Sequence, residues 1–244
     1  MAQKIITFAN HKGGVSKTTS TASIGACMAM KGKKVLLVDL DGQANLTLYF
    51  IPNEDEIETS IFDSLVNGVP LPVKHIRENL AIVPSSLEMA SAEIALTNLL
   101  ARELEPVRKD YDYILIDCPP SLGIVTTNAF IAADEIIVPM TPELLPLKGM
   151  RMLDAFVTTL QRVKPSLRLG GVFIARFNHR KLNKVVEQAV KERYESITMN
   201  TRIRENIALA ESAGSGKSIF EYDSNSNGAK DYLALTEEIL SRNQ

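Results

Sequence analysis

The chain has 244 residues, of which 45% are hydrophobic and 23% charged, which is the length and composition of one globular domain spanning residues 1–244. It contains no apolar run of about 18 residues and no signal peptide, so a membrane-spanning or secreted protein is excluded and a cytoplasmic one expected. The two cysteines, Cys27 and Cys118, suggest neither a disulfide framework nor a metal site.

Apolar runs that predict strands alternate along the chain with segments that predict helices. The predicted strands cover residues 4–10, 34–39, 80–84, 113–117, 135–139 and 170–177. Most of these runs are continuously apolar, as in strands that are buried on both faces. The predicted helices cover residues 17–31, 88–109, 123–132, 146–163, 183–194 and 229–242. This alternation favours an α/β fold, in which a doubly wound, mostly parallel sheet carries helices on both faces.

A glycine-rich loop joins the first predicted strand to the first predicted helix. Its residues are Lys12, Gly13, Gly14, Val15, Ser16, Lys17, Thr18 and Thr19. A loop of this kind turns backbone N–H groups inward around an anion, and the helix N-terminus adds its positive dipole end. Lys17 would reach the β- and γ-phosphate oxygens of a nucleotide, and Thr18 would offer its hydroxyl to Mg²⁺. The stretch therefore predicts a phosphate-binding loop of the P-loop NTPase type.

The loop departs from the standard pattern G-x-x-x-x-G-K-[ST], because His11 and Ser16 occupy the two glycine positions. An ordinary turn between a strand and a helix is therefore the alternative. The extra lysine, Lys12, favours the phosphate-binding interpretation, since K-G-G-x-x-K-T-T resembles the deviant phosphate loop of the ParA/MinD ATPases. Residues 205–212 and 217–223 are similar to the closing segment of that family. The resemblance covers essentially the full length and implies ATP and Mg²⁺ as cofactors.

Acidic residues follow two of the predicted strands, at the edge where a doubly wound sheet binds its ligands. Asp39 and Asp41 belong to a D-x-D-x-Q-x-N segment that resembles one in the family, and Asp117 ends the run 113–117. An acid at the end of an apolar strand suits a Mg²⁺ site, although a turn or helix-capping role for Asp117 is the alternative. In the family the second acid of the segment positions the attacking water. The resemblance therefore assigns that role to Asp41 and a place near Mg²⁺ to Asp39.

The extra lysine implies a second copy of the chain. In the ParA/MinD family this lysine reaches across a dimer interface to the partner's nucleotide, in the manner of an arginine finger. The resemblance thus implies a homodimer that encloses ATP, with Lys12, Lys17 and Asp41 as the catalytic residues. A merely solvated Lys12 is the alternative.

Two further arginines are expected near the nucleotide. The predicted strand 170–177 and the turn 200–204 match segments that flank the base in the family. The expected nucleotide contacts therefore include Arg176 and Arg204.

The net charge of −2 conceals a basic segment. Residues 151–204 carry 12 Lys and Arg but only 4 Asp and Glu. Because no helix-turn-helix or zinc signature accompanies them, they predict phosphate contacts and hence sequence-independent, salt-sensitive binding of double-stranded DNA. A solvated helix face is the alternative. The family has a DNA-contacting arginine at the position of Arg180. The other expected DNA contacts are Lys181, Lys184, Arg202 and Arg204.

The chain is similar to the small ParA-type partition ATPases that lack an N-terminal DNA-reading domain. In this interpretation ATP-bound dimers coat nucleoid DNA, and a ParB-like partner stimulates hydrolysis and releases them, which moves a plasmid or chromosome. The acidic polar face of the last predicted helix, 229–242, argues against docking on a membrane. Two alternatives remain: a ParA-like positioner of a protein cargo, and a nucleotide-dependent ligase or kinase for small molecules on the same scaffold.

Overall fold

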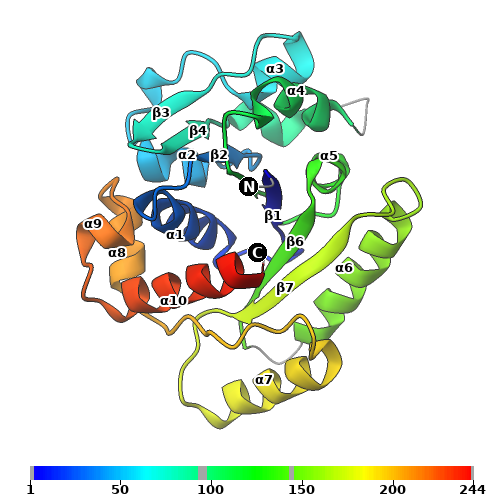
Figure 1. The fold of residues 1–244 in the computed structure, drawn as a ribbon, viewed down its shortest axis with the longest axis vertical. Coiled ribbons are helices and arrows are strands. Elements are labelled where there is room, and N and C mark those ends of the chain that lie inside the picture. Colours follow the sequence, from blue (N-terminus) through cyan, green and yellow to red (C-terminus); the bar gives the residue numbers. More distant parts are fainter. Residues whose placement is uncertain (1–2, 93–97, 143–145, 243–244) are drawn as a thin grey trace.

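The structure is a computed structural model in which residues 3–92, 98–142 and 146–242 are described. These residues form a seven-stranded sheet with helices packed on both of its faces (Figure 1). In chain order the strands are β1 (Lys4–Phe8), β2 (Val35–Asp39), β3 (Lys74–Arg77), β4 (Leu80–Val83), β5 (Tyr113–Asp117), β6 (Glu135–Met140) and β7 (Arg168–Ile174). Across the sheet they lie in the order β3-β4-β2-β5-β1-β6-β7.

The sheet is parallel except at one edge. β1 pairs in parallel with β5 and β6, β2 with β4 and β5, and β6 with β7. Only β3, at the edge, runs antiparallel to its neighbour β4 among the strands described. The central strands β1, β2 and β5 are buried along nearly their whole length, which explains their continuous apolar sequences. The mostly parallel α/β sheet predicted from the sequence is therefore confirmed.

Ten α-helices are described along the chain. They are α1 (Lys17–Met30), α2 (Asn45–Phe50), α3 (Ile61–Asn67), α4 (Leu99–Arg108), α5 (Ile124–Ala132), α6 (Pro146–Leu160), α7 (Lys181–Tyr194), α8 (Ala208–Gly214), α9 (Ile219–Tyr222) and α10 (Asn227–Arg242). Two short 3-10 turns, Glu54–Glu56 and Leu87–Ser91, accompany them.

Side chains that alternate along the strands build one apolar core on each face of the sheet. Ile5 of β1 belongs to the core that packs against α3 to α7. Its neighbour Ile6 belongs to the opposite core, which packs against α1, α2 and α10. In Figure 1 α1 and α10 accordingly lie side by side on one face of the sheet, away from α5 and α6. The sheet is therefore doubly wound.

The sequence pattern does not predict several short elements of the structure, namely β3, α2, α3, α8 and α9. The longest of them has seven residues, and helices this short form only where the rest of the fold supports them. The edge strand β3 has a half-exposed alternating pattern rather than an apolar run. Their absence from the predicted elements follows from this weak local signal.

The helix predicted over 88–109 is wrong in its first part. A 3-10 turn covers Leu87–Ser91, and the next residue is extended. Residues 93–97 lie outside the described residues, and α4 begins only at Leu99. The side chain of Asn128 fixes this start, because its Oδ1 accepts hydrogen bonds from the backbone N–H groups of Leu99 and Leu100.

The carboxyl ends of the central strands converge at one edge of the sheet. Asp117, the last residue of β5, lies in register between Phe8 of β1 and Asp39 of β2. The backbone N–H of Leu40 donates to the carbonyl of Asp117, and that of Cys118 donates to the carbonyl of Phe8. The loops that follow these three strands therefore begin side by side.

Among the residues that the structure describes, no helix combines the length and the apolar character needed to cross a bilayer.

Candidate functional site

The loop between β1 and α1 wraps around the N-terminus of α1. Two of its residues have left-handed backbone conformations, Gly14 with a φ of 71° and Ser16 with a φ of 70°. Glycine adopts this conformation freely, whereas a residue with a side chain is destabilised there by roughly 1–2 kcal/mol. The sequence could not show whether Ser16, at a glycine position of the standard pattern, needs a positive φ. The structure shows that it does.

The loop presents unused donors and a buried ammonium. The backbone N–H groups of residues 13–19 donate none of the backbone hydrogen bonds found in the described chain. Lys17 is 7% exposed, and its Nζ donates to the carbonyl of Lys12 at 3.1 Å, so the side chain folds back over the loop. Burial lowers the pKa of Lys17, and the nearby Asp117 opposes that shift. A bound anion would satisfy both the N–H groups and the ammonium.

A buried hydroxyl–carboxylate pair lies beside the loop. The Oγ1 of Thr18 donates to the Oδ2 of Asp117 at 2.6 Å. The other oxygen of this carboxylate, Oδ1, is buried and has no hydrogen-bond partner. Burial, reinforced by the charge of Asp39, raises the pKa of Asp117 well above its ordinary value. A carboxylate oxygen in this condition fits a hard divalent cation such as Mg²⁺.

No cluster of three or more His, Cys, Asp or Glu side chains that could hold a metal occurs in the described part of the chain. A cation here would therefore take Thr18 and Asp117 from the protein. Phosphate oxygens and water would supply its other ligands, which is the usual arrangement for Mg²⁺ at nucleotides.

Asp39 is fully buried, and both of its oxygens are used. Its Oδ1 accepts from the backbone N–H of Asp41 at 3.1 Å, and its Oδ2 accepts from the N–H and the hydroxyl of Thr47, each at 2.8 Å. Burial raises the pKa of Asp39 to about 6, although the hydrogen bonds from Thr47 oppose the shift. Asp39 thus ties the start of α2 and the loop after β2 to the end of the strand.

Asp41 belongs to that loop and is half-buried. Its Oδ1 accepts from the backbone N–H of Gln43 at 3.0 Å, and its carbonyl accepts from the N–H of Ala44. These local bonds fix the loop as a turn. The carboxylate lies at the wall of a cavity, where it can contact a ligand.

This cavity, of about 600 Å³, brings together side chains from distant parts of the chain. Its volume lies within the range of small-molecule sites. It is lined by Gly13, Gly14, Ser16, Lys17, Thr18, Thr19, Asp41, Gln43, Asn45, Leu48, Tyr49, Pro120, Arg176 and Ala213.

Several residues singled out in the sequence lie off this cavity wall. Val15 is buried, and Asp39 and Asp117 lie behind the wall with exposures of 0%. Conversely, Leu48, Tyr49 and Ala213 were not expected there. The first two lie on the short α2 and the last on α8, and neither helix carries a recognisable sequence signal.

The two arginines expected near the base differ in their surroundings. Arg176 lines the cavity, has a φ of 54° and forms a 3.7 Å ion pair with Glu205. The guanidinium of Arg204 instead bonds to Asp231 of α10, with Nη2 to Oδ1 at 2.6 Å and Nε to Oδ2 at 2.9 Å. The backbone N–H of Arg204 donates to the same carboxylate at 2.9 Å. Arg204 therefore attaches the segment after α7 to the last helix.

Three of the basic residues expected to contact DNA lie together at the start of α7. Arg180 is the N-cap of this helix, Lys181 and Lys184 follow in its first turn, and all three are exposed. We refer to these three residues as the α7 basic surface. Arg202 lies against the same helix, because its Nε bonds to Glu187 of α7 at 2.7 Å, and its guanidinium stacks over the ring of Phe177.

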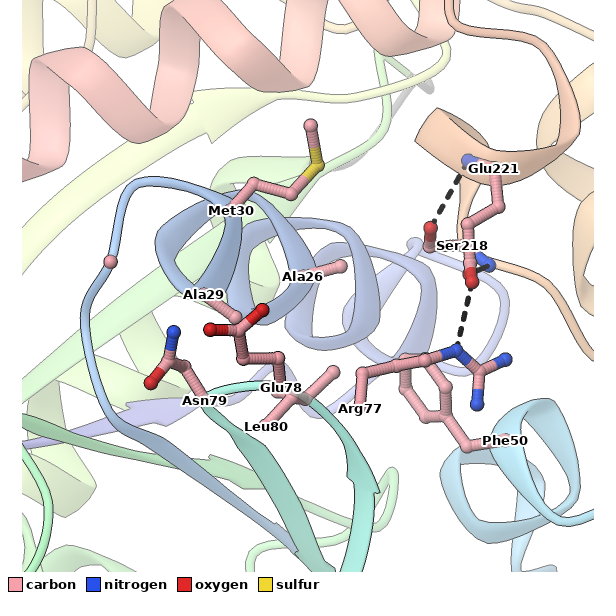
Figure 2. Close-up of a pocket in the computed structure, with 11 residues that line it drawn as sticks. Ala26, Ala29, Met30, Phe50, Arg77, Glu78, Asn79, Leu80, Ser218 and Glu221 are labelled. Atoms are coloured by element: carbon pink, nitrogen blue, oxygen red, sulfur yellow. Dashed lines mark hydrogen bonds and ion pairs between the residues drawn. The ribbon is translucent and has the colours of Figure 1, made fainter.

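A second cavity, of about 490 Å³, lies at the far end of α1 from the phosphate-binding loop. Figure 2 shows its walls: α1 contributes Ala26, Ala29 and Met30, while Arg77 and Glu221 meet on the opposite side. The Nε of Arg77 donates to Oε1 of Glu221 at 2.8 Å. Because this ion pair joins the edge strand β3 to α9, we interpret the cavity as a gap at the junction of these elements.

Comparisons with known proteins agree with this geometry. A family model described as AAA domain matches residues 3–169. The sporulation initiation inhibitor protein Soj of Bacillus subtilis is 38% identical, with 98% of each chain covered. The chromosome partitioning protein ParA of Myxococcus xanthus is 35% identical, covering 98% of this chain and 88% of that one.

The fold also matches a solved structure of a different enzyme. Cobyrinic acid a,c-diamide synthase from Mycobacterium smegmatis, with bound ADP and magnesium, superposes with a TM-score of 0.84. It is 29% identical, and the match covers 98% of this chain and 94% of the other.

Proposed function

The chain belongs to the ParA-type ATPases, with ATP and Mg²⁺ as cofactors, and on this premise we propose that it is a partition ATPase whose ATP-bound dimer binds DNA. The observation that carries the proposal is the meeting of Lys17, Thr18 and Asp41 in one cavity. Similarity to Soj and ParA proteins over 98% of the chain supports partition of a plasmid or chromosome as the process.

The phosphate-binding loop holds the triphosphate. Backbone N–H groups of residues 13–19 and the ammonium of Lys17 donate to the phosphate oxygens, and Arg176 borders the nucleotide at the cavity wall. Thr18 and Asp117 would hold Mg²⁺, and Asp39 lies beside Asp117 on the neighbouring strand. When bound, the cation neutralises negative charge on the β- and γ-phosphates.

Asp41 orients and polarises the attacking water through its carboxylate. Because a carboxylate is only a weak base, Asp41 alone supports slow turnover. Lys12 of a second copy completes the site by compensating the charge that develops on the γ-phosphate. Hydrolysis then depends on dimerisation, and a ParB-like partner that stabilises the completed site accelerates it.

The α7 basic surface contacts DNA phosphates. Arg202 and Arg204, further along the same basic segment, are the other two expected DNA contacts. Arg180, Lys181 and Lys184 are exposed, and no base-reading motif accompanies them. Binding is therefore independent of DNA sequence and weakens steeply with salt, because each neutralised phosphate releases counterions.

The decisive test measures binding to random-sequence duplex DNA with ATP, ADP or no nucleotide, at two salt concentrations. We expect binding only with ATP, weaker binding at the higher salt, and a loss in an Arg180→Glu variant. Lys109→Glu is the matched control, since it makes the same charge change at an exposed residue after α4 and leaves binding intact. Absence of DNA binding in every nucleotide state overturns the proposal.

A small-molecule ligase is the second candidate, and the structural match to cobyrinic acid a,c-diamide synthase is the specific observation that favours it. Such an enzyme forms an amide at the expense of ATP. It predicts ATP turnover that rises with a carboxylic acid substrate and an ammonia donor and that does not respond to DNA. A ParA-like positioner of a protein cargo shares the DNA-bound dimer and differs only in the partner, which co-purification from the native host identifies.

A further inference from the structure

One buried tyrosine of the last helix contacts the first turn of α1 from outside the nucleotide cavity. Tyr232 of α10 has an exposure of 0%, and its hydroxyl oxygen lies 2.9 Å from the Oγ of Ser20. The Oγ of Ser20 in turn donates to the carbonyl of Ser16 at 2.5 Å. Two consecutive hydrogen bonds thus connect α10 to the phosphate-binding loop.

The direction of these bonds follows from the donors available. A serine hydroxyl has one proton, and that of Ser20 is given to the carbonyl of Ser16. The phenol of Tyr232 must therefore donate to Ser20. Burial raises the pKa of Tyr232, so the phenol keeps its proton and remains a donor at all physiological pH values.

The residue at the end of this chain of bonds has a strained backbone. Ser16 has φ 70° and ψ 26°, the left-handed conformation that residues with a side chain disfavour. A strained conformation persists only when surrounding contacts determine it. The carbonyl of Ser16 also accepts the backbone N–H of Ser20 at 2.9 Å, so both groups that hold it belong to Ser20.

The helix that carries Tyr232 is itself fixed in place. Its neighbour Asp231 accepts hydrogen bonds from the guanidinium and the backbone N–H of Arg204. Gly228, one turn earlier, lies so close to Leu209 that an added Cβ would be 2.8 Å from its Cγ. These contacts fix the position of the helix from which the phenol of Tyr232 reaches Ser20.

We propose that Tyr232 is a positioning residue for the phosphate-binding loop, because it holds Ser16 in its left-handed conformation through Ser20. The inference rests on the proposed role of this loop in binding ATP. It assigns to α10 a part in nucleotide affinity, although Tyr232 does not line the cavity.

The first test is Tyr232→Phe, which removes one oxygen atom and keeps the ring. We expect the KM for ATP to rise about fivefold, the effect of one lost hydrogen bond, while kcat at saturating ATP stays within about twofold. Ser20→Ala, which removes the middle link, is expected to give the same split between KM and kcat.

The second test is rescue by glycine. Because glycine adopts a positive φ without strain, Ser16→Gly removes the need for support. In the Ser16→Gly background, Tyr232→Phe is expected to leave the KM for ATP unchanged. This double-mutant cycle separates a positioning role from general packing, since a packing defect would add to the effect of Ser16→Gly.

Tyr194→Phe is the matched control. Tyr194 is also a buried tyrosine, and its hydroxyl donates to Asp154 at 2.5 Å on the opposite face of the sheet. This variant is expected to lose thermal stability without changing the KM for ATP. The positioning role is overturned if Tyr232→Phe behaves like Tyr194→Phe, or if its effect on KM persists in the Ser16→Gly background.

Lys17→Ala distinguishes this outcome from failure of the proposed site. If Lys17→Ala binds ATP as well as the unaltered chain does, the loop is not the phosphate site and the proposed function fails. If Lys17→Ala loses ATP binding and Tyr232→Phe does not weaken it, only the inference about Tyr232 fails.

Discussion

At the scale of single residues, the carboxylates at the strand ends oppose the stability of the nucleotide-free fold. Asp117 has a buried oxygen without a partner, and Asp39 lies beside it on the neighbouring strand. Burial raises the pKa of both carboxyl groups, and the charge of Asp39 adds to the shift at Asp117. A protein that keeps such a pair does so for a ligand that compensates the charge.

We therefore expect Asp117→Asn to stabilise the chain in the absence of Mg²⁺ and nucleotide, by about 1 kcal/mol, since it removes a buried charge that has one oxygen without a partner. The same variant should gain less stability than the unaltered chain when MgATP is added. Urea unfolding with EDTA and with MgATP measures both effects. A variant that is less stable than the unaltered chain in EDTA contradicts this account of the site.

Backbone strain at Ala44 gives a second prediction. Ala44, the N-cap of α2, has a φ of 51°, and its N–H donates to the carbonyl of Asp41. Ala44→Gly should raise the free energy of unfolding by roughly 0.5–1 kcal/mol, because the relief of strain exceeds the entropy that glycine adds to the unfolded chain. Ala210→Gly, at an exposed position inside α8, should have the opposite sign. Equal effects of the two substitutions in urea unfolding would contradict the assignment of strain.

At the scale of elements, an ion pair attaches the edge strand β3 to the C-terminal part of the chain. Glu221 bonds to Arg77 and also closes a capping box with Ser218 at the start of α9 (Figure 2). Burial alone would raise the pKa of Glu221, but the hydrogen bonds from Arg77 and Ser218 lower it below its ordinary value. The charged form is therefore the stabilising one.

Glu221→Gln keeps the capping geometry and removes the charge. Because the pKa of Glu221 is lowered in the fold, its contribution is present above the ordinary carboxyl pKa and is lost as the pH falls through the folded value. We expect the variant to be less stable by about 0.5 kcal/mol at pH 7 and equal to the unaltered chain once the pH lies below the lowered pKa of Glu221. Urea unfolding across this range measures the difference, and Arg77→Gln should match it at pH 7. A difference that does not change with pH would rule out the ion pair as its origin.

Some of these elements could be predicted from the sequence and others could not. Long apolar strands and the helices between them could be predicted, because their residues carry the pattern themselves. Short elements such as α2 could not: it is held by hydrogen bonds from Thr47 to Asp39 of the preceding strand. The start of α4 likewise depends on Asn128, a residue of another helix. Such elements depend on contacts that a local pattern does not contain.

The residues of the candidate site also differ in how far the sequence could identify them. The phosphate-binding loop, Asp41 and Asp117 could be identified because each lies directly after a strand, where the sheet topology brings them together. Tyr49 and Ala213 reach the cavity only through the packing of short helices. Arg204 was expected to contact a ligand, but its guanidinium pairs with Asp231. This partner lies far along the chain and could not be inferred from the basic segment.

At the scale of the whole molecule, the proposed dimer predicts that each site combines residues of two copies. Lys12→Ala and Asp41→Ala should each lower ATP turnover by about 10³-fold. When the two inactive variants are mixed, a mixed dimer contains one site with both Lys12 and Asp41 intact. Turnover should then return to about a quarter of the unaltered level, because half of the dimers are mixed and half of their sites are complete.

The outcome of this mixing experiment separates the two arrangements. If Lys12 acts on the nucleotide of its own copy, no site in a mixed dimer has both residues and turnover stays absent. A mixture of Lys17→Ala with Asp41→Ala provides the matched control. Both residues act on the nucleotide of their own copy, so no mixed dimer regains a complete site and turnover stays absent.

The order of the strands also decides when the nucleotide site can form. β1 lies inside the sheet, and its hydrogen-bonding neighbours β5 and β6 follow it in the chain only after more than 100 intervening residues. Synthesis on the ribosome proceeds from the N-terminus, so β1 emerges without a partner on either side. The phosphate-binding loop that follows it gains its shape only when Asp117 and the strand after it arrive. A nascent chain thus exposes a central, buried strand first and becomes able to bind nucleotide late, which makes the interval between β1 and β6 the period in which chaperones have the most to protect.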